Sequence, residues 1–403
     1  MSTALRLALV SAFPPGRQSL NEYGLHLARE LAQRDDVAEV IVIADTLSEP
    51  AAELDLGPKV RVSRVWDFNS LAAMPKILRA LRRAAPDGAI WNLQTATFGD
   101  REMPAALGLL APAAARLMGC PSGIIAHNIV AGIDLDSTQL KGQKLRQMLV
   151  RAGGAVITRA MLAADYMTVT LKSYRDILAA AHPRAKVHLV PHGTFDTQAR
   201  AIAPVAQRPR RIVTMGKFGT YKRLETLLAA FDILRRDPRY ARYELVIGGS
   251  DHPNTLGYVA GLAAARANDP DVRFQGNVAE DDIPAFFGDA RASVFDYSAT
   301  TGSSGVLHQT ASYGAVPVFP HIGDFVDVSR DEGLNGVNYQ PNDAEDMARA
   351  LAAILSDTAR AQALAEGNRA ASLDIPLSAI AAFHVERLTR VSMPPPRGRE
   401  ATA

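Results

Sequence analysis

Short apolar segments alternate with longer amphipathic segments along almost the whole chain. The apolar segments are predicted to be strands at 6–12, 39–44, 88–94, 122–128, 166–171, 186–193, 211–216, 243–249, 272–276, 292–297 and 316–320. Helices are predicted between several of them, for example at about 20–33, 222–236 and 254–267. Because parallel strands need crossover connections, this alternation predicts parallel sheets covered by helices on both faces.

The chain has 403 residues, which is too long for one ordinary hydrophobic core. A stretch without clear periodicity contains Pro204 and Pro209 and separates two sets of alternating elements, so we expect it to be a linker. We therefore predict an α/β protein with two Rossmann-like domains, at 1–198 and 205–375. Ligands of such sheets bind at the carboxyl ends of the strands, so a cleft between the two facing domains is the expected site.

Composition restricts the class of protein. The hydrophobic fraction of 48% and the charged fraction of 21% are ordinary for a globular protein, and the formal net charge of +2 argues against a nucleic-acid partner. The single cysteine, Cys120, excludes an internal disulfide and suits a reducing compartment. The N-terminal apolar run at 5–13 is too short to span a bilayer, so we expect a buried strand and a cytoplasmic protein.

Two lysines follow the first predicted strand of the second half. The segment MGKFGTYKRLETLL predicts a strand that ends at Gly216, a loop that carries Lys217 and Lys222, and then a helix. Two cations at such a turn suit a diphosphate, because they neutralise its charge and stabilise a departing phosphate. The alternative is a solvated basic turn that binds nothing.

A loop of hydroxyl groups and glycines follows a later strand and contains no carboxylate between Tyr297 and Pro320. Ser303, Ser304 and Gly305 stand where a helix is predicted to begin. Backbone N–H groups and the helix dipole at that point favour an anion. The alternative is ordinary capping of the helix by serine.

Polar residues also follow strands of the first half. Gly16 lies in a loop after the first strand, and Asn21 or Ser19 is a candidate cap for the next helix, although the loop is equally a simple connection. His127 and His192 stand at the carboxyl ends of predicted strands, where a side chain faces a cleft. A lone histidine is nevertheless more often structural than catalytic.

Taken together, these motifs resemble the retaining glycosyltransferases of the GT-B fold, specifically glycosyltransferase family 4. The segment GKFGTYKRLETLLAAFDIL is similar to the donor-phosphate segment of that family, with Lys217 in the place of its arginine and Lys222 in the place of its lysine. In VRFQGNVAEDDIPAFFGDARASVF, the turn of Gly276, Asn277 and Val278 is similar to the turn that contacts the nucleotide base.

The first half carries the rest of the resemblance. FPPGRQSLNEYG is similar to the mobile acceptor-side loop, which implies an acceptor-side role for Gly16 and Asn21. AHN is similar to the active-site histidine strand, which implies a catalytic role for His127 and an acceptor-side role for Asn128. The resemblance also implies that the last helix, about 376–391, crosses back to the N-terminal domain.

One feature of the family is missing from the hydroxyl loop. The family has a glutamate, seven residues and a second glutamate, and alignment on Gly314 and Pro317 puts Thr301 and Gln309 at these positions. The second acid is implied to hold the ribose, which Gln309 can do in part through its amide oxygen. The first is implied to contact the donor sugar. Asp296 is the nearest carboxylate that could replace it, unless it only forms a strand-terminal turn.

The resemblance implies a metal-independent enzyme that needs no cofactor. It would move a sugar from a nucleoside diphosphate to a glycan, lipid-linked or small-molecule acceptor with retention of anomeric configuration. The departing diphosphate would help to deprotonate the acceptor, and Lys217 and Lys222 would stabilise its charge. The implied donor-binding residues are Gly216, Asn277, Val278, Asp296, Thr301, Ser303, Ser304, Gly305 and Gln309.

Other chemistries are weakly supported. No His and Cys cluster has the spacing of a zinc site, and the Asp-Leu-Asp segment at 134–136 is too common by chance to predict a metal. One alternative function is a catalytically silent nucleotide-sugar-binding subunit with a regulatory or scaffold role, which the missing acids favour. Another is a GT-B epimerase, which would need several acids in the cleft.

Two basic segments of the first half suggest where the acceptor lies. The segments 74–86 and 140–154 combine lysine and arginine with aliphatic residues at helical spacing, which is typical of a helix on an anionic membrane surface. The alternative is a helix that packs its apolar face on the sheet. We therefore expect either reversible contact with the inner face of a membrane or a soluble acceptor.

Overall fold

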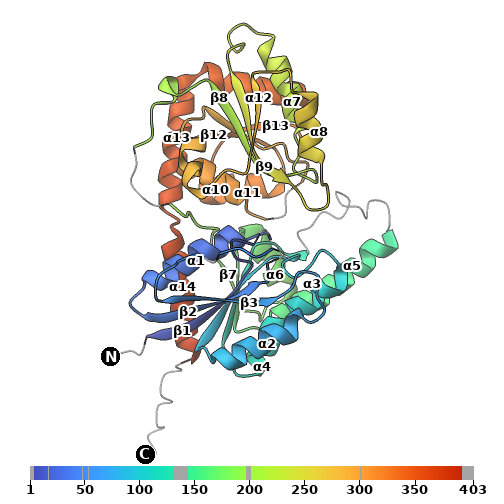
Figure 1. The fold of residues 1–403 in the computed structure, drawn as a ribbon, viewed down its shortest axis with the longest axis vertical. Helices are drawn as coiled ribbons and strands as arrows, with labels where there is room; N and C mark the ends of the chain where they lie inside the picture. Colours follow the sequence, from blue (N-terminus) through green and yellow to red (C-terminus); the bar gives the residue numbers. More distant parts are fainter. Residues whose placement is uncertain are drawn as a thin grey trace, which may run out of the picture. The chain divides into compact units, whose positions relative to one another are not determined.

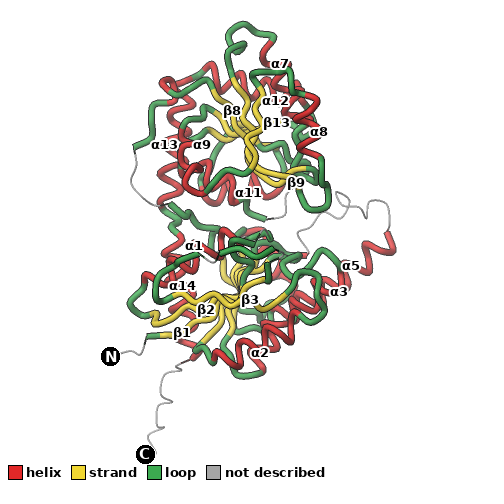
Figure 2. Tube along the Cα trace, in the orientation of Figure 1, coloured by secondary structure: helices red, strands yellow, loops and turns green. Residues whose placement is uncertain are grey.

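The computed structural model describes residues 4–16, 18–47, 49–52, 54–130, 144–196, 201–299 and 302–392. They divide into two compact units, each of which has a parallel sheet with helices around it (Figures 1 and 2). The first unit comprises the described residues up to 130, 144–191 and 377–392, and the second comprises those from 192 to 376. In the described part of the chain, no helix has both the length and the apolar character needed to cross a membrane.

The first unit contains a seven-stranded sheet in the order β3-β2-β1-β4-β5-β6-β7, and every neighbouring pair is parallel. Its strands are β1 (Leu5–Val10), β2 (Val37–Asp45), β3 (Val60–Trp66), β4 (Gly88–Leu93), β5 (Ser122–Ala126), β6 (Tyr166–Val169) and β7 (Val187–Leu189). Its helices are α1 (Asn21–Gln33), α2 (Ala73–Ala84), α3 (Glu102–Leu109), α4 (Ala111–Leu117), α5 (Lys144–Met161), α6 (Lys172–Ala181) and α14 (Leu377–Ser392). The sequence predicted all strands of this sheet except β3.

Helices cover both faces of this sheet, as the alternating sequence predicts (Figure 1). α1 packs on α14, and a second group comprises α3 and α4, which contact each other, with α2 and α5, each of which contacts both. A buried hydrogen bond fastens α14: the hydroxyl of Tyr166 on β6 lies 2.9 Å from Nδ1 of His384. The last helix of the chain therefore packs on the N-terminal sheet.

The second unit contains a six-stranded parallel sheet in the order β10-β9-β8-β11-β12-β13. Its strands are β8 (Arg211–Phe218), β9 (Glu244–Asp251), β10 (Val272–Gly276), β11 (Ala292–Val294), β12 (Val316–Pro320) and β13 (Val337–Tyr339). Its helices are α7 (Glu225–Arg235), α8 (Tyr258–Ala265), α9 (Ile283–Gly288), α10 (Gly305–Ser312), α11 (Gly323–Glu332), α12 (Ala344–Ser356) and α13 (Thr358–Leu373). Both sheets thus have the Rossmann-like form that was predicted.

The ends of β8 and β9 lie unusually close together. The two strands stay in register to Phe218 and Asp251, beyond the predicted end of β8 at Gly216. Gly249 has a φ of 125°, and a Cβ atom there would lie 1.9 Å from the carbonyl oxygen of Gly216. Only glycine fits this position, and the close pairing fixes the backbone that carries Lys217.

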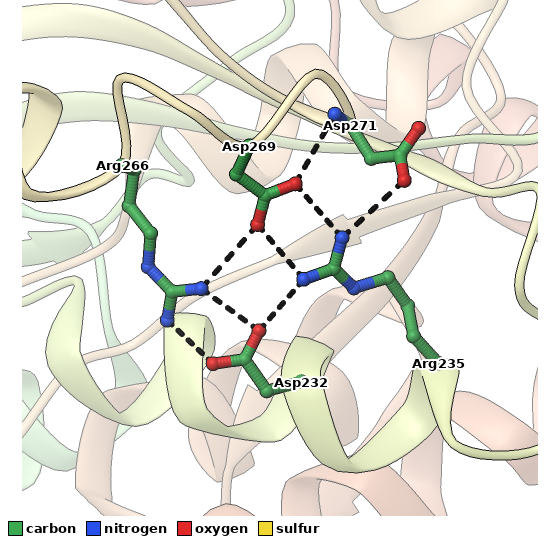
Figure 3. Close-up of polar contacts among 5 residues, drawn as sticks. All are labelled: Asp232, Arg235, Arg266, Asp269 and Asp271. Carbon is green, nitrogen blue, oxygen red and sulfur yellow. Dashed lines mark hydrogen bonds and ion pairs between the residues drawn. The ribbon is translucent and has the colours of Figure 1, made fainter.

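A charged network joins α7 to the chain that enters β10 (Figure 3). Arg235 on α7 makes two bonds of 2.8 Å to the carboxylate of Asp269 and one of 2.9 Å to Asp232. Arg266 binds both oxygens of Asp232 at 2.6 and 2.8 Å, and Asp271 accepts a further bond from Arg235. Because each arginine binds more than one carboxylate, the network orders α7, the end of α8 and the following turn as one block.

We expect Arg235→Ala to lower the free energy of unfolding by about 1 kcal/mol at pH 7, since the side chain is mostly covered and its bonds are charge-assisted. Hydrogen bonds from Arg235 and Arg266 lower the pKa values of Asp269 and Asp232. A lowered folded-state pKa gives stability that is present above the ordinary carboxyl pKa and is lost as the pH falls through the folded value. Urea unfolding should therefore show the effect of the mutation shrinking in acid, and Arg239→Ala, which breaks an exposed pair with Asp237, should show no effect at either pH.

Candidate functional site

Lys222 lies between two tyrosine rings at the carboxyl edge of the second sheet. Its Nζ atom is 4.9 Å from the ring centre of Tyr297, which follows β11, and 5.8 Å from that of Tyr221. Lys222 and Tyr297 also form an isolated backbone bridge, and the N–H of Ser298 donates to the carbonyl of Tyr221 at 2.8 Å. The basic turn and the start of the hydroxyl loop, separate motifs in the sequence, are therefore joined in the structure.

No carboxylate neutralises Lys222 in the described part of the chain. The pKa of Lys222 is affected by burial and by the two tyrosines, of which Tyr297 is also its hydrogen-bond partner, and no ion pair involves it among the described residues. Lys217 lies within β8 itself, opposite Ser250 of β9, and Gly216 lies under the stem of Lys222. A partly buried cation without an acidic partner is suited to an anionic ligand.

The hydroxyl loop leads into α10 as predicted. α10 begins at Gly305, and Ser304 is its N-cap, accepting a long bond of 3.4 Å from the N–H of Leu307. Among the described residues, the hydroxyls of Thr220 and Ser303 are buried without a hydrogen-bond partner, whereas that of Tyr297 interacts with Lys222. Because an unpaired buried hydroxyl is costly, the two in the loops after β8 and β11 favour a ligand that supplies the missing bonds. Thr301 lies outside the described residues.

Gln309 lies on a face of α10 that lines a small pocket inside the second unit. The pocket is lined by His192, Gly193, Phe195, Asp196, Gly305, His308, Gln309, Ser312 and Tyr313. The rings of His192 and His308 stack in it with their centres 4.6 Å apart. His192, which the sequence suggested only as a strand-end residue, therefore packs against α10. The contact of Gln309 with a ribose stays a prediction.

Asp296 has a structural partner that the sequence did not reveal. It is 2% exposed, and its Oδ2 atom accepts a 3.0 Å bond from the N–H of Leu227 in the first turn of α7. Thr226 donates to the same carboxylate, while burial raises the carboxyl pKa. Asp296, just after β11, thus caps α7. These contacts favour a structural role for Asp296 over a role as a substitute donor-binding acid.

The predicted base-contacting turn follows β10 at the edge of the sheet. Gly276 and Asn277 are exposed, and Val278 is partly buried. Val278 packs so closely on Gly248 of β9 that a Cβ atom there would lie 2.6 Å from its Cγ2 atom. The turn is therefore at the same carboxyl edge as Lys217 and leaves the side chain of Asn277 accessible.

In the first unit, His127 is buried in a polar cluster at the ends of β4 and β5. Its Nε2 atom lies 2.7 Å from Oδ1 of Asn92, and the Nδ2 atom of Asn92 donates to Ser11 and to the carbonyl of Leu20. Since that carbonyl can only accept, the Asn92 amide orientation is fixed, and His127 must carry its proton on Nε2. Burial lowers its pKa to about 3, so His127 is a neutral polar group and not a cation. The sequence analysis did not identify Asn92 as a site residue, because it lies inside an apolar strand.

The acceptor-side loop differs in detail from the prediction. The N-cap position of α1 is Leu20, so neither Asn21 nor Ser19 stands at the cap, although Oδ1 of Asn21 accepts a 2.9 Å bond from the N–H of Glu22 in the first turn. Asn21 also donates to the carbonyl of Gly16 at 2.6 Å. Arg64 on β3 donates to the carbonyl of Phe13 at 2.8 Å and anchors the start of this loop.

Asn128 and the possible metal ligands complete the list of predicted residues. The Oδ1 atom of Asn128 accepts a 2.8 Å bond from the N–H of Thr95, and Asn128 lines a mostly apolar pocket with Ile129, Met161 and Met167. Within the described ranges, no group of three His, Cys, Asp or Glu side chains could hold a metal ion. The Asp-Leu-Asp segment at 134–136 lies outside those ranges.

Sequence comparison identifies the second unit. Residues 209–357 match the family described as glycosyl transferases group 1, so the chain contains a domain of this kind. None of the curated protein sequences compared with the chain matches it significantly. The matched residues include Lys217, Lys222, the hydroxyl loop and α10, and the contacts above join Lys222 to the start of that loop.

Solved structures match both units along nearly their whole length. Sucrose-phosphate synthase from Thermosynechococcus elongatus has a TM-score of 0.70 at 16% identity, covering 96% of this chain and 98% of that one. HepE from Anabaena in complex with UDP and glucose scores 0.68 at 15% identity, over 96% and 99% of the chains. Trehalose-phosphate synthase from Burkholderia xenovorans, in complex with glucose-6-phosphate, scores 0.67 at 11% identity, over 95% and 100%. The predicted GT-B fold is thereby confirmed.

Proposed function

We propose that the glycosyl transferases group 1 domain at 209–357 makes this protein a retaining, metal-independent glycosyltransferase of family 4. The donor would be a nucleoside diphosphate sugar, bound at the carboxyl edge of the second sheet. The observation that carries the proposal is the position of Lys222, a partly buried cation that lies against Tyr297 of the hydroxyl loop and has no carboxylate partner among the described residues. The similar structures of HepE are complexes with UDP and glucose and with UDP-glucose, which supports a uridine nucleotide as the first donor to examine.

The residues present suit the charge that develops on the departing diphosphate. Lys217 and Lys222 would stabilise it, the hydroxyl of Ser303 would donate to it, and the N–H groups of the first turn of α10 would face it. Gln309 would hold the ribose through its amide. A neutral His127, bonded through Nε2 to Asn92, would serve the acceptor side as a polar group without adding charge.

The second candidate function is a nucleotide-sugar-binding subunit without turnover. It is favoured by the absence of both acids of the Glu-x7-Glu pattern, at Thr301 and Gln309. The two functions share nucleotide binding and differ in cleavage of the donor, so a binding experiment tests what they have in common and a hydrolysis experiment separates them.

A thermal-shift panel of nucleoside diphosphates and their sugars tests the binding step. We expect one nucleotide family to raise the melting temperature, because a ligand at about 100 times its dissociation constant adds about 2.7 kcal/mol to the stability. Lys222→Met should remove most of this shift and serves as the matched control. A panel in which no nucleotide stabilises the wild-type protein would contradict both functions.

For the acceptor, we propose a substrate at an anionic membrane surface on the cytoplasmic side. α2 and α5 each carry four basic residues and no acidic one. These helices contact α3 and α4, and the exposed apolar residues in the four helices or directly beside them are Leu71, Met103, Leu117, Met118, Met148 and Val156. Basic side chains around scattered exposed apolar groups are suited to reversible contact with anionic lipid.

The interpretation of segment 74–86 as a membrane-surface helix needs a correction, because the structure shows how α2 packs. Ile77 and Leu81 are buried, so the apolar face of this helix packs inside the unit, as the structural alternative held. Apart from Pro75, its exposed residues are the basic ones, among them Arg79, Arg82 and Arg83. In segment 140–154, residues 140–143 lie outside the described ranges, while Lys144 and Met148 are exposed.

Sedimentation with vesicles of phosphatidylglycerol and phosphatidylcholine tests this acceptor proposal. We expect the protein to pellet at low salt and to be released at high salt, since each surface Lys or Arg contributes about 1 kcal/mol near anionic lipid. Arg82→Glu/Arg83→Glu should weaken the binding, whereas Arg184→Glu/Lys186→Glu, on the same unit but outside the four helices, should not. Protein that stays in the supernatant at low salt would indicate a soluble acceptor.

A further inference from the structure

The two ends of α11 place buried carboxylates against the hydroxyl loop, which has no acid of its own. Asp324, in the first turn of α11, accepts a 2.5 Å bond from the N–H of Gly302. Glu332, the last residue of α11, lies 2.7 Å from Nε2 of His308 on α10. The side chains of His308 and Glu332 are 2% and 6% exposed, and Asp324 is 8% exposed.

The contacts of His308 require a shared proton. Its Nδ1 atom lies 2.8 Å from the carbonyl oxygen of Ser304, which can only accept, so Nδ1 carries a hydrogen. Nε2 faces Oε2 of Glu332, and one proton must lie between them, either on an imidazolium beside a carboxylate or on a carboxylic acid beside a neutral ring. The carboxylate raises the pKa of His308 against the opposing effect of burial, which favours the ion pair.

We propose that Asp324 and Glu332 are positioning residues for the donor site, and that they hold the two residues on either side of Ser303. Asp324 fixes the backbone of Gly302, whose φ of 111° already requires glycine. Glu332 acts through the proton on His308 and fixes the carbonyl of Ser304. The unpaired hydroxyl of Ser303, between these two anchors, is thereby held in one direction toward the ligand.

This inference rests on the proposed function, because it assigns an orientation to a group of the proposed donor site. It also explains how a loop without a carboxylate can be ordered by acids from elsewhere in the unit. One oxygen of Glu332 is buried without a partner, a cost that a purely structural pair would avoid. The other ionisable side chains on elements packed against α10 are His192 and Asp196, Arg360, Glu366 and Arg369 of α13, and Asp327, Arg330 and Asp331 of α11, which pair with one another; α9 and β12 carry none.

Calorimetric titration with UDP tests the two anchors. Asp324→Ala should weaken UDP binding about tenfold, since the Gly302 N–H loses its acceptor, whereas Asp324→Asn, which keeps an acceptor oxygen, should stay within about threefold of wild type. Asp327→Asn is the matched control on the same helix, because its carboxylate pairs with Arg330. Equal affinity of the Ala and Asn variants for UDP would overturn the role of Asp324.

Glu332→Gln tests the shared proton without breaking the packing. The amide can donate to Nε2 while Nδ1 still donates to Ser304, so UDP affinity near neutral pH should stay within about threefold of wild type. In wild type the affinity should fall as the pH rises and the pair loses its proton, because His308 must then give up one bond. In Glu332→Gln this fall of affinity with pH should be absent. Ionisation of UDP affects both proteins equally, so it cancels when their pH profiles are compared. Identical pH profiles would overturn the role of Glu332.

Nitrogen-15 spectra of histidine-labelled protein provide a readout that needs no ligand. Both ring nitrogens of His308 should carry protons near neutral pH in wild type, and only Nδ1 should do so in Glu332→Gln. A neutral His308 with a bare Nδ1 would contradict the inference. If wild-type protein does not bind UDP or another nucleotide but shows the doubly protonated ring, the proposed function fails and the proton assignment stands.

Discussion

Lys222→Ala is expected to lower the rate of donor hydrolysis at least about tenfold, which is about 1.4 kcal/mol in the barrier, while the protein stays folded. Lys222 lies over Tyr297 without a carboxylate partner among the described residues, so its charge is available to the departing diphosphate. Steady-state hydrolysis of the best donor from the thermal-shift panel gives the measurement.

Two further variants at this position separate charge from packing. Lys222→Met keeps most of the stem that passes over Gly216 and removes the charge, so it should be as slow as the alanine variant. Lys222→Arg keeps the charge and should recover part of the rate. A methionine variant with wild-type hydrolysis would exclude a role for Lys222 in stabilising the leaving group.

Asp296→Ala is expected to lower the free energy of unfolding by about 2–3 kcal/mol and to leave UDP affinity nearly unchanged in the folded fraction. The substitution removes the cap of α7 and leaves the N–H of Leu227 buried without an acceptor. Urea unfolding and calorimetric titration of the same preparation measure the two effects. Asp296→Asn, which keeps an acceptor oxygen, should lose less stability.

The opposite pattern would restore the interpretation of Asp296 as a donor-binding acid. In that pattern, the variant has the stability of wild type but binds a nucleotide sugar much more weakly than the nucleotide alone. The sequence could not decide between these possibilities, because the partner of Asp296 on α7 lies 69 residues earlier in the chain.

Local patterns in the sequence predicted the fold well. Central strands such as β4 are buried on both faces and read as continuous apolar runs, which makes them easy to find. β3 was missed because it is an edge strand, and its Val, Arg and Ser residues alternate instead of forming such a run. The period-two alternation was present in the sequence and would have predicted it.

The candidate site was predicted less completely, because its residues come from distant segments. Lys222 and the hydroxyl loop were found, since each follows a strand of the second sheet. Asp324 and Glu332 were missed: both are on a helix after the next strand, and nothing in their own segment marks them as inward-facing. The loop that lacks an acid in the sequence therefore has two acids next to it in the structure.

Cleavage of a nucleotide sugar is the most direct test of the account. Proton NMR can follow a panel of nucleoside diphosphate sugars, with UDP-glucose first, incubated with wild-type protein and with Lys222→Met. We predict that wild-type protein slowly releases the nucleoside diphosphate from one donor, that the sugar first appears with the anomeric configuration of that donor, and that Lys222→Met does not cleave it. A protein that binds the nucleotide and leaves every donor intact, or that releases the inverted sugar, would contradict a retaining glycosyltransferase.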